Sequence, residues 1–206
     1  MIQRIANALI KRWGTATAKQ RVWDSEYKTG RWTYQRGGQN NESREPVYGF
    51  LEKYGAGGSI LDLGCGSGMT ALEMRNNFRE YLGVDISEIA VGKARVELCK
   101  EIDRAHKTRF FASDISSFQP DRKFSVILFR ESIYYVPQHQ IGQMINRYCS
   151  HLCPGGVFIV RVCDKDAYKG IIRLLETNLQ VTDTYFAQDS KMVILACSPR
   201  GEVILD

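Results

Sequence analysis

A glycine-rich turn and the acidic residues near it are the part of the sequence best suited to hold a ligand. Gly64, Gly66 and Gly68 follow the apolar run at 59–63, and Asp85 lies 21 positions after Gly64. Because glycine has no Cβ, the backbone at such a turn can approach a ligand closely, and the helix that follows offers free N–H donors. An acidic residue at this distance can accept hydrogen bonds from both hydroxyls of a ribose. The spacing therefore predicts a nucleoside site.

The charge beside the turn indicates which nucleoside binds. The dinucleotide fingerprint G-x-G-x-x-G requires a third glycine at position 69, where this chain has Met69. Asp62 comes shortly before the glycines, and a carboxylate there opposes a pyrophosphate but attracts an ammonium or sulfonium group. These two features favour the cationic nucleoside S-adenosylmethionine (SAM) over NAD as the cofactor.

Alternating strands and helices must position this turn, and the sequence from Pro46 onward predicts them. The predicted strands span residues 59–63, 81–84, 109–112, 124–129, 157–162, 181–187 and 191–197, with a turn at 154–156. The predicted helices span residues 69–78, 87–107, 138–152 and 165–178. This order predicts an α/β fold with a mostly parallel sheet, helices on both faces and one antiparallel strand. Ligands of such sheets bind beyond the carboxyl ends of the strands, where the glycine turn lies.

Length and composition indicate one globular domain with a short attachment. The chain has 206 residues, of which 44% are hydrophobic and 25% charged. No apolar stretch approaches the roughly 20 residues that cross a bilayer, and no signal-peptide cleavage pattern is present, so a cytoplasmic protein is expected. Cys149, His151 and Cys153 resemble a zinc-binding run, but structural zinc sites usually present two separated ligand pairs, and no metal is expected.

Residues 1–45 are predicted to form an attachment to a catalytic domain that spans residues 46–206. Residues 1–13 place apolar side chains at helical spacing, which predicts an amphipathic helix. Such a helix can dock on the protein's own body, pair two subunits into a homodimer, or lie on an anionic membrane surface; docking or pairing is favoured. Residues 14–45 are polar, aromatic-rich and glycine-containing, which is typical of a lid rather than a core element.

Five motifs in order resemble those of the class I SAM-dependent methyltransferases, from about residue 46 to residue 198. They are ILDLGCGSG at 60–68, YLGVDIS at 81–87, FFASDI at 110–115, FSVILF at 124–129 and LCPGG at 152–156. The resemblance implies a Rossmann-like, seven-stranded sheet whose last strand is antiparallel. It also implies which residues bind SAM: Gly64, Cys65, Gly66 and Gly68 along the methionine part, Asp62 near its amino group, Asp85 on the ribose, Ile86 and Ile115 around the adenine, Asp114 on the adenine amino group, and Arg130.

Two further segments look like those of small bacterial methyltransferases related to the nodulation-type N-methyltransferases. They are WDSEYKTGRW at residues 23–32 and RESIYYV at residues 130–136. The nodulation-type enzymes methylate the amino group of a deacetylated chitin oligosaccharide, and the subgroup also contains members of unassigned substrate. The resemblance implies a leading cap over the site and an acceptor-side segment after the fourth strand.

The acceptor side of the site has few candidates for chemistry. Methyl transfer from a sulfonium uses an activated donor, so the protein mainly aligns the acceptor and removes a proton where needed. Glu131 follows the fourth strand and can orient or deprotonate an amine, or serve as a helix-cap or ion-pair residue. Tyr134 and Tyr135 can line the acceptor site, contact the sulfonium through their ring faces, or only pack. The candidates for a lid over cofactor or substrate are Tyr27, Trp32, Tyr34 and Arg44.

These features favour a SAM-dependent methyltransferase with an N or O acceptor on a small-molecule or saccharide-like substrate. The N/D-P-P-Y/F signature of many amino-directed nucleic-acid and protein methyltransferases is replaced by Arg130-Glu131-Ser132-Ile133. Residues 1–36 carry a net charge of +6 and the remaining residues −1, so no basic face surrounds the site and a nucleic-acid partner is not favoured. The alternatives are an RNA-directed methyltransferase that uses the basic N-terminal segment, and a non-catalytic SAM-binding module.

Overall fold

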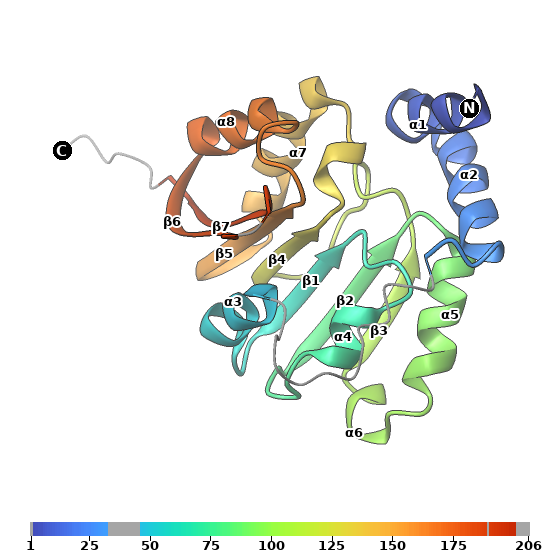
Figure 1. Cartoon of the computed structure of the whole chain (residues 1–206). Coiled ribbons are helices and arrows are strands. Elements are labelled where there is room, and N and C mark those ends of the chain that lie inside the picture. Colours follow the sequence, from blue (N-terminus) through green and yellow to red (C-terminus); the bar gives the residue numbers. More distant parts are fainter. Residues whose placement is uncertain (1, 33–45, 189, 201–206) are drawn as a thin grey trace.

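A seven-stranded sheet forms the centre of the protein (Figure 1). The computed structural model describes residues 2–32, 46–188 and 190–200. The strands are β1 (Ser59–Leu63), β2 (Glu80–Asp85), β3 (Thr108–Ala112), β4 (Phe124–Arg130), β5 (Leu152–Val162), β6 (Leu179–Phe186) and β7 (Val193–Pro199). Their order is β3-β2-β1-β4-β5-β7-β6, and β7 runs antiparallel to both of its neighbours. The predicted α/β, Rossmann-like sheet with an antiparallel last strand is confirmed.

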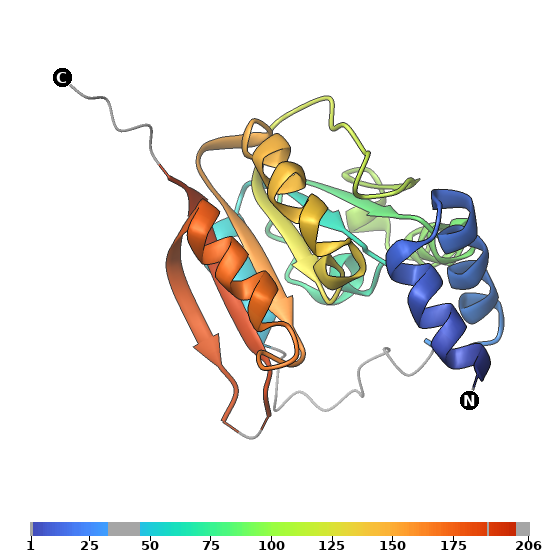
Figure 2. The ribbon, with the colours of Figure 1, turned by 90° about the horizontal axis from the view of Figure 1, so that it is seen from above.

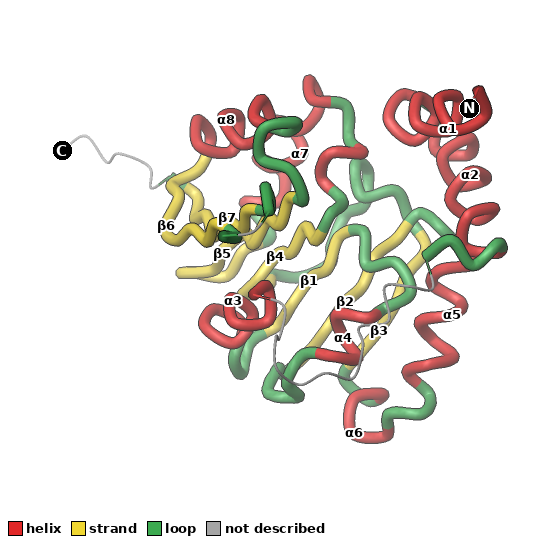
Figure 3. The backbone as a smooth tube through the Cα atoms, viewed as in Figure 1, coloured by secondary structure: helices red, strands yellow, loops and turns green. Residues whose placement is uncertain are grey.

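Helices cover both faces of the sheet, as Figures 2 and 3 show. They are α1 (Ile2–Trp13), α2 (Ala16–Lys28), α3 (Pro46–Gly55), α4 (Met69–Glu73), α5 (Glu88–Leu98), α6 (Ile102–Ala105), the 3₁₀ helix η2 (Ile133–Tyr135), α7 (Gln138–Cys149) and α8 (Lys169–Asn178). Apolar residues of α7 and α8 pack on one face of the sheet, and those of α3, α4 and α5 pack on the other. The two faces thus form two hydrophobic cores.

The glycine turn lies at the switch point of the sheet, where strands are added on one side of β1 (β2, β3) and then on the other (β4, β5). β1 lies between β2 and β4 and pairs in parallel with both, so the carboxyl ends of the three strands meet. All five residues of β1 are buried, which agrees with the continuous apolar pattern of a central parallel strand. This is the position at which open α/β sheets bind ligands.

Several predicted boundaries differ from those in the structure. The helix predicted at 69–78 ends at Glu73, and the helix predicted at 87–107 is divided into α5 and α6. The turn predicted at 154–156 lies inside β5, where Gly155 has a φ of 73° and the register with β4 shifts. The bulge absorbs the local bend without ending the strand, which the glycine pair alone did not reveal.

The described N-terminal segment, residues 2–32, contains the predicted first helix, α1, and a second helix, α2, inside the region predicted as a lid. Thr15 caps α2, because its side chain accepts a hydrogen bond from the N–H of Ala18 at 3.3 Å. Asp24 joins α2 to the start of α5 by accepting hydrogen bonds from the hydroxyl of Ser87 at 2.6 Å and the N–H of Ile89 at 3.2 Å. The predicted domain boundary at residue 45 lies outside the described residues.

Within the described part of the chain, every helix is too short or too polar to cross a bilayer. The cytoplasmic location expected from the sequence stays a prediction.

Candidate active site

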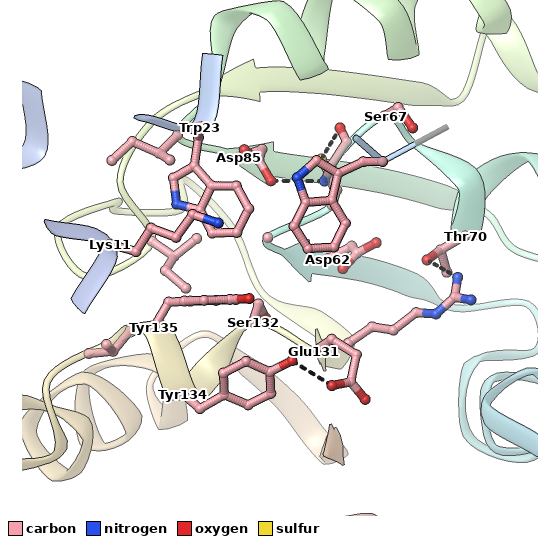
Figure 4. Close-up of a pocket in the computed structure, with 18 of the residues that line it drawn as sticks. Lys11, Trp23, Asp62, Ser67, Thr70, Asp85, Glu131, Ser132, Tyr134 and Tyr135 are labelled. Atoms are coloured by element: carbon pink, nitrogen blue, oxygen red, sulfur yellow. Dashed lines mark hydrogen bonds between the residues drawn. The ribbon is translucent and has the colours of Figure 1, made fainter. Parts of the chain in front are cut away.

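A cavity of about 530 Å³ opens beyond the carboxyl ends of β1, β2 and β4 (Figure 4). This volume lies within the range of small-molecule sites. Its walls come from the glycine turn, the ends of the strands, η2 and the N-terminal helices. Figure 4 shows Asp85 and Ser67 across the cavity from Tyr134, Tyr135 and Glu131.

The glycine turn is held in a shape that side chains would not permit. Gly64 has a φ of 88°, and a Cβ built on it would lie 2.3 Å from the Cβ of Ser132. Gly66 has a φ of 55°, and a Cβ there would lie 2.5 Å from the hydroxyl oxygen of Tyr27. The Ser132 hydroxyl also donates a hydrogen bond to the carbonyl oxygen of Leu63. The turn is therefore enclosed by the segment after β4 and by α2, and its backbone faces the cavity.

Asp85 closes the turn from the end of β2. One of its carboxylate oxygens accepts a hydrogen bond from the N–H of Gly66 at 2.9 Å, and the other accepts one from the N–H of Ser87 at 2.9 Å. The side chain is buried, and burial raises the pKa of Asp85 to about 6. Because each carboxylate oxygen has two lone pairs, both can accept a further hydrogen bond from a diol in the cavity.

Asp62 is the buried carboxylate at the floor of the cavity. It is 1% exposed, and one oxygen accepts a hydrogen bond from the hydroxyl of Tyr81. The other oxygen, Oδ1, has no hydrogen-bond partner among the residues that the structure describes. Burial raises the pKa of Asp62 to about 6, against the effects of the Tyr81 hydroxyl, the Arg130 charge and the Thr70 hydroxyl. A buried carboxylate oxygen without a partner is costly, so this atom is suited to a cationic or hydrogen-bonding ligand group.

Four more of the predicted cofactor residues line the cavity around these two carboxylates and suit SAM. Arg130 donates hydrogen bonds to the hydroxyls of Tyr48 and Thr70, both at 3.2 Å, and lies on the Asp62 side of the cavity, where a guanidinium suits the carboxylate of the methionine part. The lining residues beyond Asp85 that suit an adenine are Ile86, Asp114 and Ile115. Asp114 accepts hydrogen bonds from the N–H of Ser116 at 2.8 Å and its hydroxyl at 2.7 Å.

Glu131 is fixed on the opposite wall. Its carboxylate pairs with the guanidinium of Arg161 and accepts hydrogen bonds from the Tyr134 hydroxyl at 2.6 Å and the N–H of Cys163 at 3.1 Å. Its φ of 59° makes Glu131 the only non-glycine residue with positive φ in the described part of the chain. A residue held in this sparsely populated conformation beside a cavity indicates a functional constraint.

Aromatic side chains of the N-terminal segment line the cavity. Trp23 contacts Tyr135 edge-to-face, with ring centroids 4.8 Å apart, and lies 5.6 Å from the ring of Trp32. The ammonium of Lys11 lies 3.7 Å from the ring centroid of Trp23 and 2.6 Å from a carboxylate oxygen of Glu26. Burial lowers the pKa of Lys11. The N-terminal helices therefore supply part of the site.

Most of the predicted site residues line this one cavity. They are Tyr27, Trp32, Asp62, Gly64, Cys65, Gly66, Asp85, Ile86, Asp114, Ile115, Arg130, Glu131, Tyr134 and Tyr135. Gly68 does not line it: it caps the start of α4 in the left-handed conformation, and a Cβ there would meet Phe110 and Ala94. Tyr34 and Arg44 lie outside the described residues. The roles assigned to individual residues stay predictions.

Four charged or aromatic residues that line the cavity were not among the site residues predicted from the sequence, namely Lys11, Lys19, Trp23 and Arg161. Lys19, Trp23 and Tyr27 recur at intervals of four, which is the spacing of one helix face, so recognising α2 would have indicated the first two of them. No comparable signal marks Lys11, because it lies on the polar side of an amphipathic helix.

Comparison with known proteins gives the family. The methyltransferase-domain family matches residues 35–191, which is most of the chain. The chain belongs to the methyltransferase family. The family and its methyl donor, SAM, are therefore as predicted from the sequence.

A similar protein is the dTDP-3-amino-3,4,6-trideoxy-alpha-D-glucopyranose N,N-dimethyltransferase of Streptomyces venezuelae, which is 28% identical over 104 residues, or 50% of this chain and 41% of that protein. This chain spans about half the length, or less, of the curated relatives it matches first.

Solved structures agree with the fold. The N-methyltransferase NodS of Bradyrhizobium japonicum WM9, in complex with S-adenosyl-l-homocysteine, matches with a TM-score of 0.70 and 18% identity, over 88% of this chain and 98% of that one. The magnesium protoporphyrin IX methyltransferase of Synechocystis PCC 6803 with bound SAM matches with a TM-score of 0.69 and 20% identity, over 89% and 96%. Both likenesses confirm the predicted Rossmann-like methyltransferase fold.

The two buried carboxylates, Asp62 and Asp85, predict a pH-dependent affinity for SAM. Because burial raises the pKa of both carboxyls to about 6, we expect the protonated fraction of Asp62 and Asp85 to increase as the pH falls through this value. Protonation removes the charge that attracts a cationic ligand, so the dissociation constant of SAM should rise as the pH falls from 7.5 to 5, by roughly tenfold. Isothermal titration calorimetry at several pH values measures this.

The matched variant for the pH experiment is Asp62→Asn, which keeps the shape and removes one titrating group. It should bind SAM more weakly at pH 7.5 and show a flatter pH dependence than the unaltered protein. An unaltered slope would assign the titration to other groups.

Proposed function

We propose that this protein transfers the methyl group of SAM to a nitrogen acceptor on a small, saccharide-like molecule. The observation that supports SAM as the donor is the buried Asp62 oxygen that has no hydrogen-bond partner among the described residues. It lies beside the glycine turn, whose Gly66 N–H donates a hydrogen bond to Asp85. The donor group supplies an activated methyl bonded to a positively charged sulfur. The carboxylates hold the cationic and ribose parts of the donor, and the enclosed turn keeps it in one orientation.

The acceptor side of the cavity supports nitrogen over oxygen. When a neutral amine takes a methyl group, positive charge develops on its nitrogen. The rings of Tyr134, Tyr135 and Trp23 line the cavity, and the Glu131 carboxylate, which is paired with Arg161, supplies negative charge beside the two tyrosines. Such a wall stabilises a cationic transition state more than it would help to ionise a hydroxyl. The amino-sugar N,N-dimethyltransferase among the relatives agrees with this substrate class.

The direct test is turnover with paired acceptors. The protein is incubated with SAM and either amino sugars or their hydroxyl counterparts, and S-adenosylhomocysteine is quantified by mass spectrometry. Product with the amines and none with the hydroxyl partners supports the proposal. Product only with hydroxyl or carboxyl acceptors contradicts the nitrogen assignment, and SAM binding without product from any acceptor identifies a binding module. Salt-sensitive methylation of RNA identifies the RNA-directed alternative.

Glu131 gives a separate prediction for catalysis. Glu131→Gln keeps the size of the side chain but removes the charge that pairs with Arg161 and faces the acceptor wall. We expect kcat to fall by about tenfold to a hundredfold while SAM affinity changes less than twofold, since removing one charge-stabilising or proton-accepting group has effects of this size. Steady-state kinetics and calorimetry on the same sample measure both quantities. Unchanged kcat would leave Glu131 with a structural role.

A further inference from the structure

The outward face of α1 is apolar. Ile5, Leu9 and Trp13 are 58%, 58% and 56% exposed, and their spacing of four residues places them in one stripe along the helix. The opposite side of α1 attaches to the body through Lys11, which is buried against Glu26 and Trp23. The amphipathic helix is therefore rotated so that much of its apolar side points away from the protein. Docking on the protein's own body, which the sequence favoured as one option, accounts for the Lys11 side of the helix and for one contact of the stripe, the stacking of Trp13 on His139 with ring centroids 6.0 Å apart. Ile5 and Leu9 still point away from the protein.

The exposed charges of the described N-terminal segment have one sign. The exposed or half-buried basic residues of the described N-terminal segment are Arg4, Arg12, Arg21, Lys28 and Arg31. The segment has two carboxylates, and both face the protein: Asp24 accepts hydrogen bonds from the start of α5, and Glu26 is 5% exposed. Every exposed charge of residues 2–32 is thus positive.

The apolar stripe together with the positive charge of residues 2–32 favours one kind of surface as the partner of α1. A symmetric pairing of two α1 helices would bring Arg12 of each copy, which flanks the stripe, toward a surface that is equally basic, which opposes association. An anionic bilayer satisfies both features, because the apolar stripe enters the boundary between headgroups and acyl chains while the basic residues meet lipid phosphates. Trp13, at the end of the helix, is a residue type that favours this boundary.

We propose that α1 lies flat on an anionic phospholipid surface, with Ile5, Leu9 and Trp13 inserted and the basic residues of α1 and α2 against the headgroups. A helix of 12 residues is about 18 Å long, which suits an in-plane position and not a crossing. Figures 1 and 2 show α1 at the edge of the molecule, beside α2 and away from β6 and β7, so a flat surface can reach it. The proposal does not depend on the identity of the methyl acceptor.

The test is co-sedimentation of the full chain with lipid vesicles. The full chain should bind vesicles that contain about 30% phosphatidylglycerol in phosphatidylcholine, bind pure phosphatidylcholine at least tenfold more weakly, and be released by high salt. Leu9→Asp should weaken binding to the anionic vesicles by about tenfold or more, since it removes an inserted side chain and adds a charge of the wrong sign. Arg4→Gln combined with Arg21→Gln should weaken binding by a smaller factor and reduce its salt dependence.

The matched control is Ile102→Asp, which makes the same kind of change at a residue of α6 that is 85% exposed. It should bind vesicles almost as well as the unaltered protein, and all variants should retain SAM affinity by calorimetry, which shows that they fold. Equal binding of Leu9→Asp and Ile102→Asp would overturn the proposal. Absence of vesicle binding would also overturn it. A dimer that Leu9→Asp dissociates in analytical ultracentrifugation, without lipid binding, would assign the stripe to self-pairing.

Discussion

Replacing Asp85 with alanine should weaken SAM binding by about 100-fold, or about 2.7 kcal/mol. The variant loses the acceptor for the ribose hydroxyls, and it also releases the N–H groups of Gly66 and Ser87, which the carboxylate holds at 2.9 Å each. Hydrogen bonds to a charged group contribute roughly 1.5–3 kcal/mol each, so the loss of the ribose contacts and of the turn geometry together supports a change of this size. Calorimetric titration of SAM into the variant measures it.

The control for Asp85 is Asp183→Ala, which removes an aspartate from β6 at the far edge of the sheet. Asp183 pairs with Lys53 at 2.7 Å and has no place in the cavity. Its replacement should leave SAM affinity unaltered. If Asp85→Ala also binds SAM normally while its melting temperature matches that of the control, the ribose assignment is wrong.

Replacing Glu26 with alanine should lower the melting temperature by roughly 10 °C, the largest stability effect that we expect from one substitution in the cap. The Glu26 carboxylate accepts hydrogen bonds from Lys11 at 2.6 Å, Arg31 at 2.9 Å and the indole of Trp32 at 3.0 Å. Its removal leaves the buried Lys11 charge without its partner, and breaking a buried pair in this way costs about 3–5 kcal/mol. Differential scanning calorimetry measures the change.

The Glu26 variant should also change the site, because α1 and α2 cover it. With Lys11 released from Trp23, the cap should loosen and SAM affinity should fall several-fold. The matched control is Asp166→Ala, which breaks an ion pair with Lys191 in which both side chains are more than 60% exposed. That variant should melt almost as the unaltered protein does. Equal melting temperatures for the two variants would mean that the buried pair does not hold the cap.

The sequence by itself determined the sheet and the cofactor half of the site. Short, mostly apolar runs such as residues 59–63, alternating with helical segments, predict central strands of a parallel sheet, and the glycines and carboxylates lie near the strand ends, where the topology brings them together. The apolar pattern of a strand and the spacing of glycines and carboxylates after it are set by residues close together in the sequence. Asp62, Gly64, Gly66 and Asp85 were therefore predicted correctly as neighbours in one cavity.

Only the tertiary structure decided how the N-terminal helices contribute. The pattern of residues 1–13 predicts a helix with an apolar side, but its rotation against the body depends on partners far away in the sequence. The buried pair of Lys11 with Glu26, 15 residues apart, turns the polar side of α1 inward and leaves Leu9 outside. The contacts of Glu131 with Arg161, 30 residues away, are likewise invisible to local spacing. Hydrophobic periodicity describes one helix at a time, whereas desolvating and pairing a charge is a property of the assembled chain.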